Sequence, residues 1–132
     1  MFVLCVDWGG GVMAEPNPEE LVLLGIKSYE KQDFSKAKGY FEKACDLNIS
    51  GGCGALGILY DDGEGVEKTQ KKAAQFYSKA CELKEGDGCG ALGALYYNGD
   101  GVKQDSKKAV ALFERACKLG YKKACEMLKL LR

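Results

Sequence analysis

Six of the seven cysteines form three evenly spaced pairs, and they are the residues best placed for chemistry. The two members of each pair stand eight positions apart, and each pair repeats 36 positions further on. Regular, even-numbered cysteines in a short chain are typical of a disulfide framework made in an oxidising compartment. A zinc site is the alternative, but zinc ligands prefer two to four intervening residues. We favour disulfides over metal binding or free thiols. The cysteines are Cys45 and Cys53, Cys81 and Cys89, and Cys117 and Cys125.

Two Ser-x-x-Lys motifs offer a second kind of chemistry, because this spacing places a serine nucleophile and a lysine base on one helical face. The motifs are Ser28 with Lys31 and Ser35 with Lys38. The Ser-Asp-Asn and Lys-Thr-Gly partners of serine β-lactamases are absent from the sequence. A serine beside a lysine on a helix surface is usually only solvated, so these four residues are weak catalytic candidates.

The composition excludes several other function classes. The chain has 132 residues and no histidine, which removes Ser-His-Asp and Cys-His catalysis, His-ligated zinc and metallo-β-lactamase chemistry. Its 19 basic and 19 acidic residues balance, so its charge favours neither nucleic acid nor a membrane surface. No apolar run reaches the roughly 18 residues of a membrane-spanning helix. We expect no metal, no cofactor, no nucleic acid partner and no membrane span.

The elements that position these residues repeat with the same 36-residue period, which indicates an array of helical hairpins. Apolar residues at spacings of three and four predict first helices at about 18–31, 52–61 and 88–97. Second helices follow, each with a residue suited to an N-cap: Asp33, Thr69 and Asp105. Small residues at Ala37, Ala73 and Ala109 would let these helices approach their neighbours closely.

A glycine recurs inside each first helix, where it costs about 1 kcal/mol relative to alanine. These glycines are Gly25, Gly57 and Gly93. Such a costly residue at one register position predicts a neighbouring helix pressed against the backbone. We therefore predict an all-α, right-handed α-α superhelix, a solenoid of three helix-hairpin repeats with a C-terminal capping helix.

The chain divides into a short leading segment and a repeat domain. Residues 1–14, which contain Cys5, are predicted to be a leader or a disordered tail, and residues 15–132 the repeat domain. The repeats are expected at about 18–50, 51–86 and 87–121, followed by the cap at 122–132.

The second and third repeats share the pattern Ala-Leu-Gly-x-Leu-Tyr-x-x-Gly-x-Gly-Val followed by Lys-Lys-Ala. This pattern resembles the Sel1-like repeat, a relative of the tetratricopeptide repeat, over about 19–132. The added cysteine pair is similar to that of the Helicobacter cysteine-rich proteins. The first repeat departs from the pattern, because it lacks the Gly-x-Gly turn and the first cysteine.

The resemblance implies a pairing and a setting. In that family each pair is joined within a helix–loop–helix, which implies Cys45–Cys53, Cys81–Cys89 and Cys117–Cys125. It also implies a secreted or periplasmic protein, here expected to be a monomer, with a link to penicillin binding and weak β-lactamase activity.

Two functions remain open at this point. The first is a scaffold that binds a peptide, a protein or a cell-wall-derived (peptidoglycan or penicillin-like) ligand in a groove lined by the first helices. The second is a slow serine-type β-lactamase or penicillin-binding hydrolase. For any single groove residue, a plain structural or solvating role is the alternative. Aligned to the tetratricopeptide frame, the predicted groove residues are Ile26, Tyr29, Glu30, Gly54, Ile58, Asp61, Asp62, Gly90, Ala94, Tyr97 and Asn98.

Overall fold

The computed structural model describes residues 17–131, and this part of the chain is built of α-helices. The predicted leading segment 1–14, with Cys5, lies outside the described residues. None of the helices in residues 17–131 is long and apolar enough to cross a membrane. The helices are α1 (Pro18–Glu30), α2 (Phe34–Asp46), α3 (Ser50–Asp62), α4 (Gln70–Glu82), α5 (Gly86–Asn98), α6 (Ser106–Lys118) and α7 (Lys122–Leu131).

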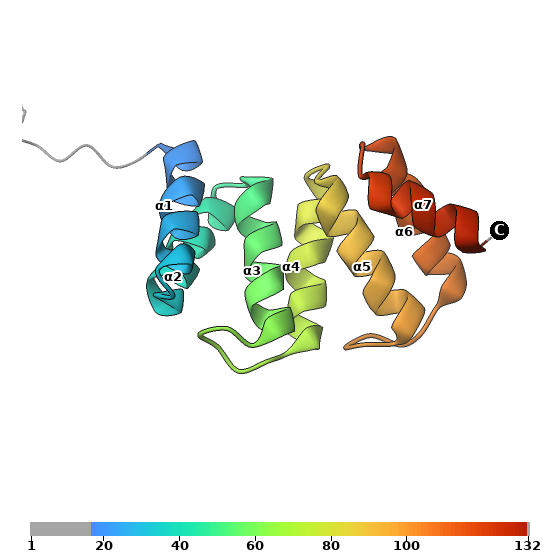
Figure 1. Cartoon of the computed structure of the whole chain (residues 1–132), viewed down its shortest axis with the longest axis horizontal. Helices are drawn as coiled ribbons and strands as arrows, with labels where there is room; N and C mark the ends of the chain where they lie inside the picture. The colour runs from blue at the N-terminus through green and yellow to red at the C-terminus, as the bar shows by residue number, and fades with distance from the viewer. Residues whose placement is uncertain (1–16, 132) are drawn as a thin grey trace, which may run out of the picture.

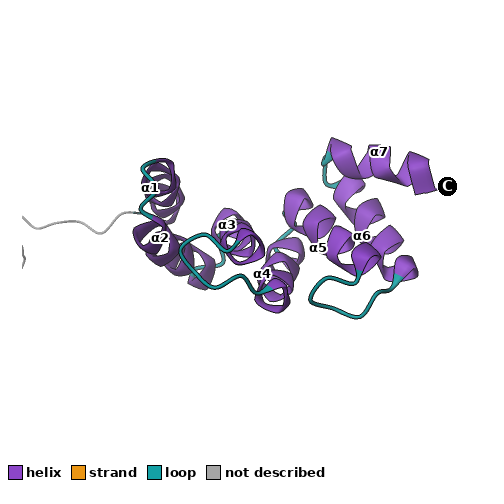
Figure 2. Cartoon of the chain, turned by 60° about the horizontal axis from the view of Figure 1, so that its bottom comes forward, coloured by secondary structure: helices purple, strands orange, loops and turns teal. Residues whose placement is uncertain are grey.

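The helices pack in the order in which they occur in the chain (Figure 1). The pairs α1/α2, α3/α4 and α5/α6 form antiparallel hairpins. α2 and α4 also contact the first helix of the next hairpin, and α6 contacts the single helix α7. Figure 2 shows the hairpins stacked along one direction with no strands between them, and α7 lies beyond α6. The prediction of an all-α array of helix hairpins is confirmed.

Small residues set the distance between the two helices of each hairpin, as predicted. Ala37, Ala73 and Ala109 are completely buried. Gly57 of α3 lies against the ring of Tyr77 of α4, and a Cβ atom added at this glycine would stand only 2.4 Å from Cδ1 of the ring. Gly25 meets Phe41 and Gly93 meets Phe113 in the same way. Each hairpin is therefore closed by an aromatic ring seated on bare backbone.

The helix starts differ from the predictions in two details. α3 and α5 begin at Ser50 and Gly86, two residues before the predicted starts, because their glycine-rich first turns carry no strong helix signal. Asp33 and Asp105 cap their helices, each accepting a bond from the backbone N–H three residues on. Thr69 occupies the cap position but makes no side-chain cap, because its hydroxyl donates to the carbonyl of Glu67.

Candidate functional site

Three disulfides connect the hairpins, and they are the pairs that the family resemblance implied. In each, the cysteine near the end of a second helix is joined to one in the first turns of the next helix. The Cα atoms of Cys45 and Cys53 lie 4.6 Å apart, and those of the other pairs lie 4.5 and 4.8 Å apart. Metal ligation and free thiols are thereby overturned for these six cysteines. The pairs are Cys45–Cys53, Cys81–Cys89 and Cys117–Cys125.

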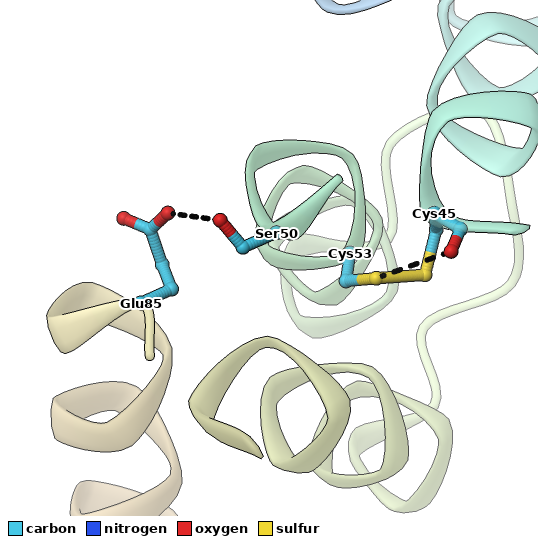
Figure 3. Close-up of a disulfide and its surroundings, with 4 residues drawn as sticks. All are labelled: Cys45, Ser50, Cys53 and Glu85. Carbon is cyan, nitrogen blue, oxygen red and sulfur yellow. Dashed lines mark hydrogen bonds between the residues drawn. A yellow bond between two sulfur atoms is a disulfide. The ribbon is translucent and has the colours of Figure 1, made fainter. Parts of the chain in front are cut away.

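A hydrogen bond reinforces the alignment of two successive first helices beside the first disulfide (Figure 3). The hydroxyl of Ser50, at the start of α3, donates to Glu85 at 2.9 Å, and Glu85 precedes α5. The disulfides hold each hairpin to the next, and this contact joins the first helices themselves. On the surface formed by α1, α3 and α5, this bond therefore braces α3 against α5 at one end.

A hollow of about 450 Å³ runs along this braced surface. We call it the α1–α3–α5 groove. Ile26 and Ile58, on neighbouring helices, line it with 43% and 46% of their surface exposed. Two glycines of α3, Gly51 and Gly54, also line the groove, and their backbone is not covered by side chains of their own. Its other lining residues include Val22, Ala55, Glu85, Asp87, Ala91 and Tyr121.

The groove continues into a smaller, almost wholly apolar hollow of about 220 Å³. Ile26, Ala55 and Ile58 border both hollows, and Tyr29 belongs to the smaller one. The Tyr29 hydroxyl donates to Glu64 at 2.6 Å, and this bond to a carboxylate raises the pKa of the phenol. The contact also fixes the glycine turn after α3 beside α1.

The predicted groove residues divide into three groups. Ile26, Gly54 and Ile58 line the groove, and Tyr29 lines its extension. Asp61 is held by two partners of α4: Gln70 donates to it at 3.1 Å and the hydroxyl of Tyr77 at 3.3 Å. Burial is the main reason that the pKa of Tyr77 is raised. The residues that border neither hollow are Glu30, Asp61, Asp62, Gly90, Ala94, Tyr97 and Asn98.

Gly90 differs most from its predicted place on an open inner face. It is buried, and a Cβ atom added there would lie 2.5 Å from Cε2 of Tyr121. The ring of Tyr121, in the turn before α7, covers the glycine backbone that was expected to face a ligand. The tyrosine itself was missed, as were Glu85 and Asp87, because all three lie at the junctions between a second helix and the helix that follows it, Asp87 in the first turn of α5. The repeat register of the first helices carries no signal for residues at these junctions.

The four catalytic candidates do not form an activated serine. Ser28 is 7% exposed, and its hydroxyl donates to the carbonyl of Leu24 at 2.9 Å, as a serine inside a helix commonly does. Lys31, its motif partner, is exposed at the end of α1. Lys38 bonds Glu42 at 3.0 Å, which raises the pKa of the lysine. A lysine that acts as a base needs the opposite shift, so this geometry gives the exposed Ser35 no support as a nucleophile.

Comparison with known proteins decides the family. The family model of the Sel1 repeat matches residues 22–49, 52–85 and 86–121. The chain belongs to the Sel1 repeat family. This Sel1 repeat chain is 64% identical over 63 residues to HcpC of Helicobacter pylori, which covers 48% of the chain and 22% of HcpC. It is 57% identical over 63 residues to Beta-lactamase HcpA of the same species, covering 48% of the chain and 25% of HcpA.

The solved structure of Helicobacter pylori cysteine rich protein B is similar in fold over most of the Sel1 repeat chain. Its TM-score is 0.70 at 38% sequence identity, and the alignment covers 90% of the chain and 100% of that structure. The aligned part spans about a quarter of the curated relatives HcpC and HcpA. The chain is thus a disulfide-bonded Sel1 repeat scaffold related to the Helicobacter cysteine-rich proteins.

Proposed function

We propose that this Sel1 repeat scaffold works outside the cytoplasm and binds an extended peptide segment, free or as part of a cell-wall fragment, in the α1–α3–α5 groove. The observation that carries this proposal is the exposure of Ile26 and Ile58 side by side in a hollow floored by glycine. Covering an isoleucine removes apolar surface from water and contributes about 1.5–3 kcal/mol. Two such side chains next to open backbone suit an extended chain with apolar side chains.

The charged residues of the groove narrow the class of peptide that it would bind. Glu85 and Asp87 line one end of it, where the Ser50 hydroxyl already bonds Glu85. The groove lining contains no lysine or arginine among the described residues. A peptide with an apolar residue over Ile58 and a basic side chain or amino group near Asp87 would match both features.

Replacing Ile58 with serine is expected to weaken peptide binding about tenfold, since the variant loses most of one buried apolar contact. The measurement is fluorescence polarisation with nine-residue peptides selected from a random array on the oxidised protein. Leu23→Ser is the matched control, because Leu23 is 58% exposed and lies outside the groove lining. Equal losses in the two variants, or no loss at Ile58→Ser, would contradict the groove.

Export from the cytoplasm is supported by the three disulfides, which persist in oxidising compartments. A reducing compartment would open such bonds and leave six thiols. Thiol counting on protein taken directly from the producing cell, denatured without reductant, distinguishes the two settings. Six reactive thiols from Cys45 to Cys125 would contradict export.

Hydrolysis of β-lactams is the second candidate, because the relative HcpA carries the name Beta-lactamase. If the chain hydrolyses a chromogenic cephalosporin, the double change Ser28→Ala and Ser35→Ala is expected to leave the rate within about twofold. The reason is that Ser28 bonds a backbone carbonyl and Lys38 is paired with Glu42. A loss of a hundredfold or more, the usual size for removal of a nucleophile or its base, would instead establish a serine mechanism.

A further inference from the structure

A second hollow lies between α4 and α6, away from the groove, and most of its charged lining residues are basic. It has a volume of about 570 Å³, within the usual range for small-molecule sites of roughly 300–1,000 Å³. We call it the α4–α6 trough. Its walls come from these two helices, and Leu92 and Tyr96 of α5 contribute to its lining. Its charged lining residues are Lys71, Lys108, Arg115 and Glu82.

Two of the cations stand at one end of the trough, where an anion would be best stabilised. Lys71 and Lys108 lie in the first turns of α4 and α6, where the helix dipole is positive and a cation is unfavourable. The loop before α6 adds to this end, because Gly101 packs against the backbone of Gln70 and Lys71. An anion bound here would offset the two side-chain charges and the dipole of α4, which has no side-chain cap, whereas Asp105 already caps α6.

The equivalent junction one repeat earlier has the opposite charge balance. A hollow of about 500 Å³ lies between α2 and α4, and its charged lining residues are Glu42, Lys43 and Asp46. Thirty-six positions further on, Glu42 becomes Ser78, which removes one carboxylate. The chain therefore carries two hollows of one design, of which only the later one has an excess of cations in its lining.

Two further replacements distinguish the later junction. In the earlier repeat, Lys38 forms an ion pair with Glu42. In the later repeat, Ala74 stands at the position equivalent to Lys38, so this ion pair has no counterpart in α4. Phe76 stacks on Tyr60 with ring centroids 5.5 Å apart, whereas its counterpart Leu112 has no ring, and the ammonium of Lys108 lies over the Tyr96 ring, 4.5 Å from its centre. Within residues 17–131, neither Lys71 nor Arg115 forms an ion pair.

We propose that the α4–α6 trough binds a small organic anion, with one carboxylate, sulfonate or phosphate on an apolar body. The acid group is placed between Lys71 and Lys108, and the apolar body lies along Ala74, Leu92 and Leu112. Arg115 and Glu82 at the other end leave room for a polar tail. This site is separate from the peptide groove, so a negative result for one site does not contradict the other.

The test is a titration of the oxidised, ¹⁵N-labelled chain with 4-phenylbutyrate, followed by amide chemical shifts. The neutral 4-phenylbutyramide serves as the matched ligand. Shifts are expected to saturate and to cluster around Lys71–Ser78, Tyr96 and Lys108–Arg115. The amide is expected to bind about tenfold more weakly, because it lacks the charge that the two lysines recognise.

Two variants separate charge from shape. Lys71→Gln with Lys108→Gln is expected to weaken the acid about tenfold and leave the amide unchanged. The triple change Ala74→Lys, Ser78→Glu and Leu112→Phe gives the trough the residues of the earlier repeat at these three positions, and is expected to abolish saturable binding of the acid. Lys107→Gln is the control, since Lys107 is exposed on α6 outside the trough lining.

Three results would overturn the proposal. The first is saturable binding whose shifts cluster elsewhere, for example around Ile26 and Ile58. The second is equal affinity for the acid and the amide. The third is unchanged affinity in a triple variant whose spectrum remains that of the folded chain.

Discussion

Replacing Cys81 and Cys89 together with alanine is expected to lower the free energy of unfolding by about 2–3 kcal/mol. This bond closes a short loop, and the entropy that such a closure removes from the unfolded chain corresponds to that amount. Both cysteines are buried, at 2% and 0% exposure, so lost packing adds to the effect. Because the bond lies between the second and third hairpins, its loss weakens the middle of the array. Urea unfolding followed by circular dichroism measures the change.

The matched control is the double replacement of Cys117 and Cys125, which are only partly buried and tie α7 alone to α6. Its effect is expected mainly in α7, as faster amide hydrogen exchange there, with a smaller change in the main transition. The central role of Cys81–Cys89 is refuted if the two double variants lower the main unfolding transition equally.

Replacing Gly57 with alanine is expected to lower the free energy of unfolding by about 1–2 kcal/mol, although alanine is the better helix former. The added Cβ atom would lie 2.4 Å from Cδ1 and Cε1 of the Tyr77 ring, so the ring or the helix must move. Overpacking of this kind costs typically 1–3 kcal/mol and at times more, against a gain of about 1 kcal/mol from helix propensity. Thermal and urea unfolding both report the difference.

Gly54 provides the control for Gly57 in the same helix. A Cβ atom at Gly54 meets no heavy atom within 4 Å, so Gly54→Ala is expected to raise the free energy of unfolding by about 0.5–1 kcal/mol. The opposite signs at two glycines three positions apart isolate the ring contact from helix propensity. A stabilised Gly57→Ala variant would show that the α3–α4 spacing is not set by Tyr77.

The fold was predictable because one register runs through the whole array. Ala73 and Ala109 are buried where Ala37 is, and Gly93 meets Phe113 as Gly57 meets Tyr77. A single sequence therefore gives more than one example of the residue type that each position of the repeat requires. The cysteine pairs follow the same register, and for this reason their pairing was correctly anticipated from a resemblance to a family with that spacing.

The candidate site was predictable only where it lies on the repeated helices. Ile26 and Ile58 were placed by register, and both line the groove. Gly90 was misplaced because Tyr121, which covers it, belongs to the turn before α7 and has no repeat counterpart of the same kind. The contact of Tyr29 with Glu64 joins residues 35 positions apart through a glycine turn. Such loop contacts depend on turn geometry, which helix periodicity does not encode.

The α4–α6 trough depends on differences between repeats, whereas the fold depends on their likeness. Ala74 and Ser78 were readable in the sequence as departures from Lys38 and Glu42. Their meaning needed the structure, because only there do Lys71, Lys108 and Arg115 line one hollow. Positions that break the pattern of a repeat array therefore mark its individual sites.

The disulfides have a further consequence for how the protein matures. Each of the six paired cysteines is bonded to a partner eight residues away, across one interhelical turn. In a chain that emerges N-terminus first from a narrow pore, each bond can close before the next pair of thiols appears. Wrong pairings require two thiols distant in the sequence to meet. They are suppressed when the earlier thiols are already bonded, so the disulfides form one after another from the N-terminal pair to the C-terminal pair.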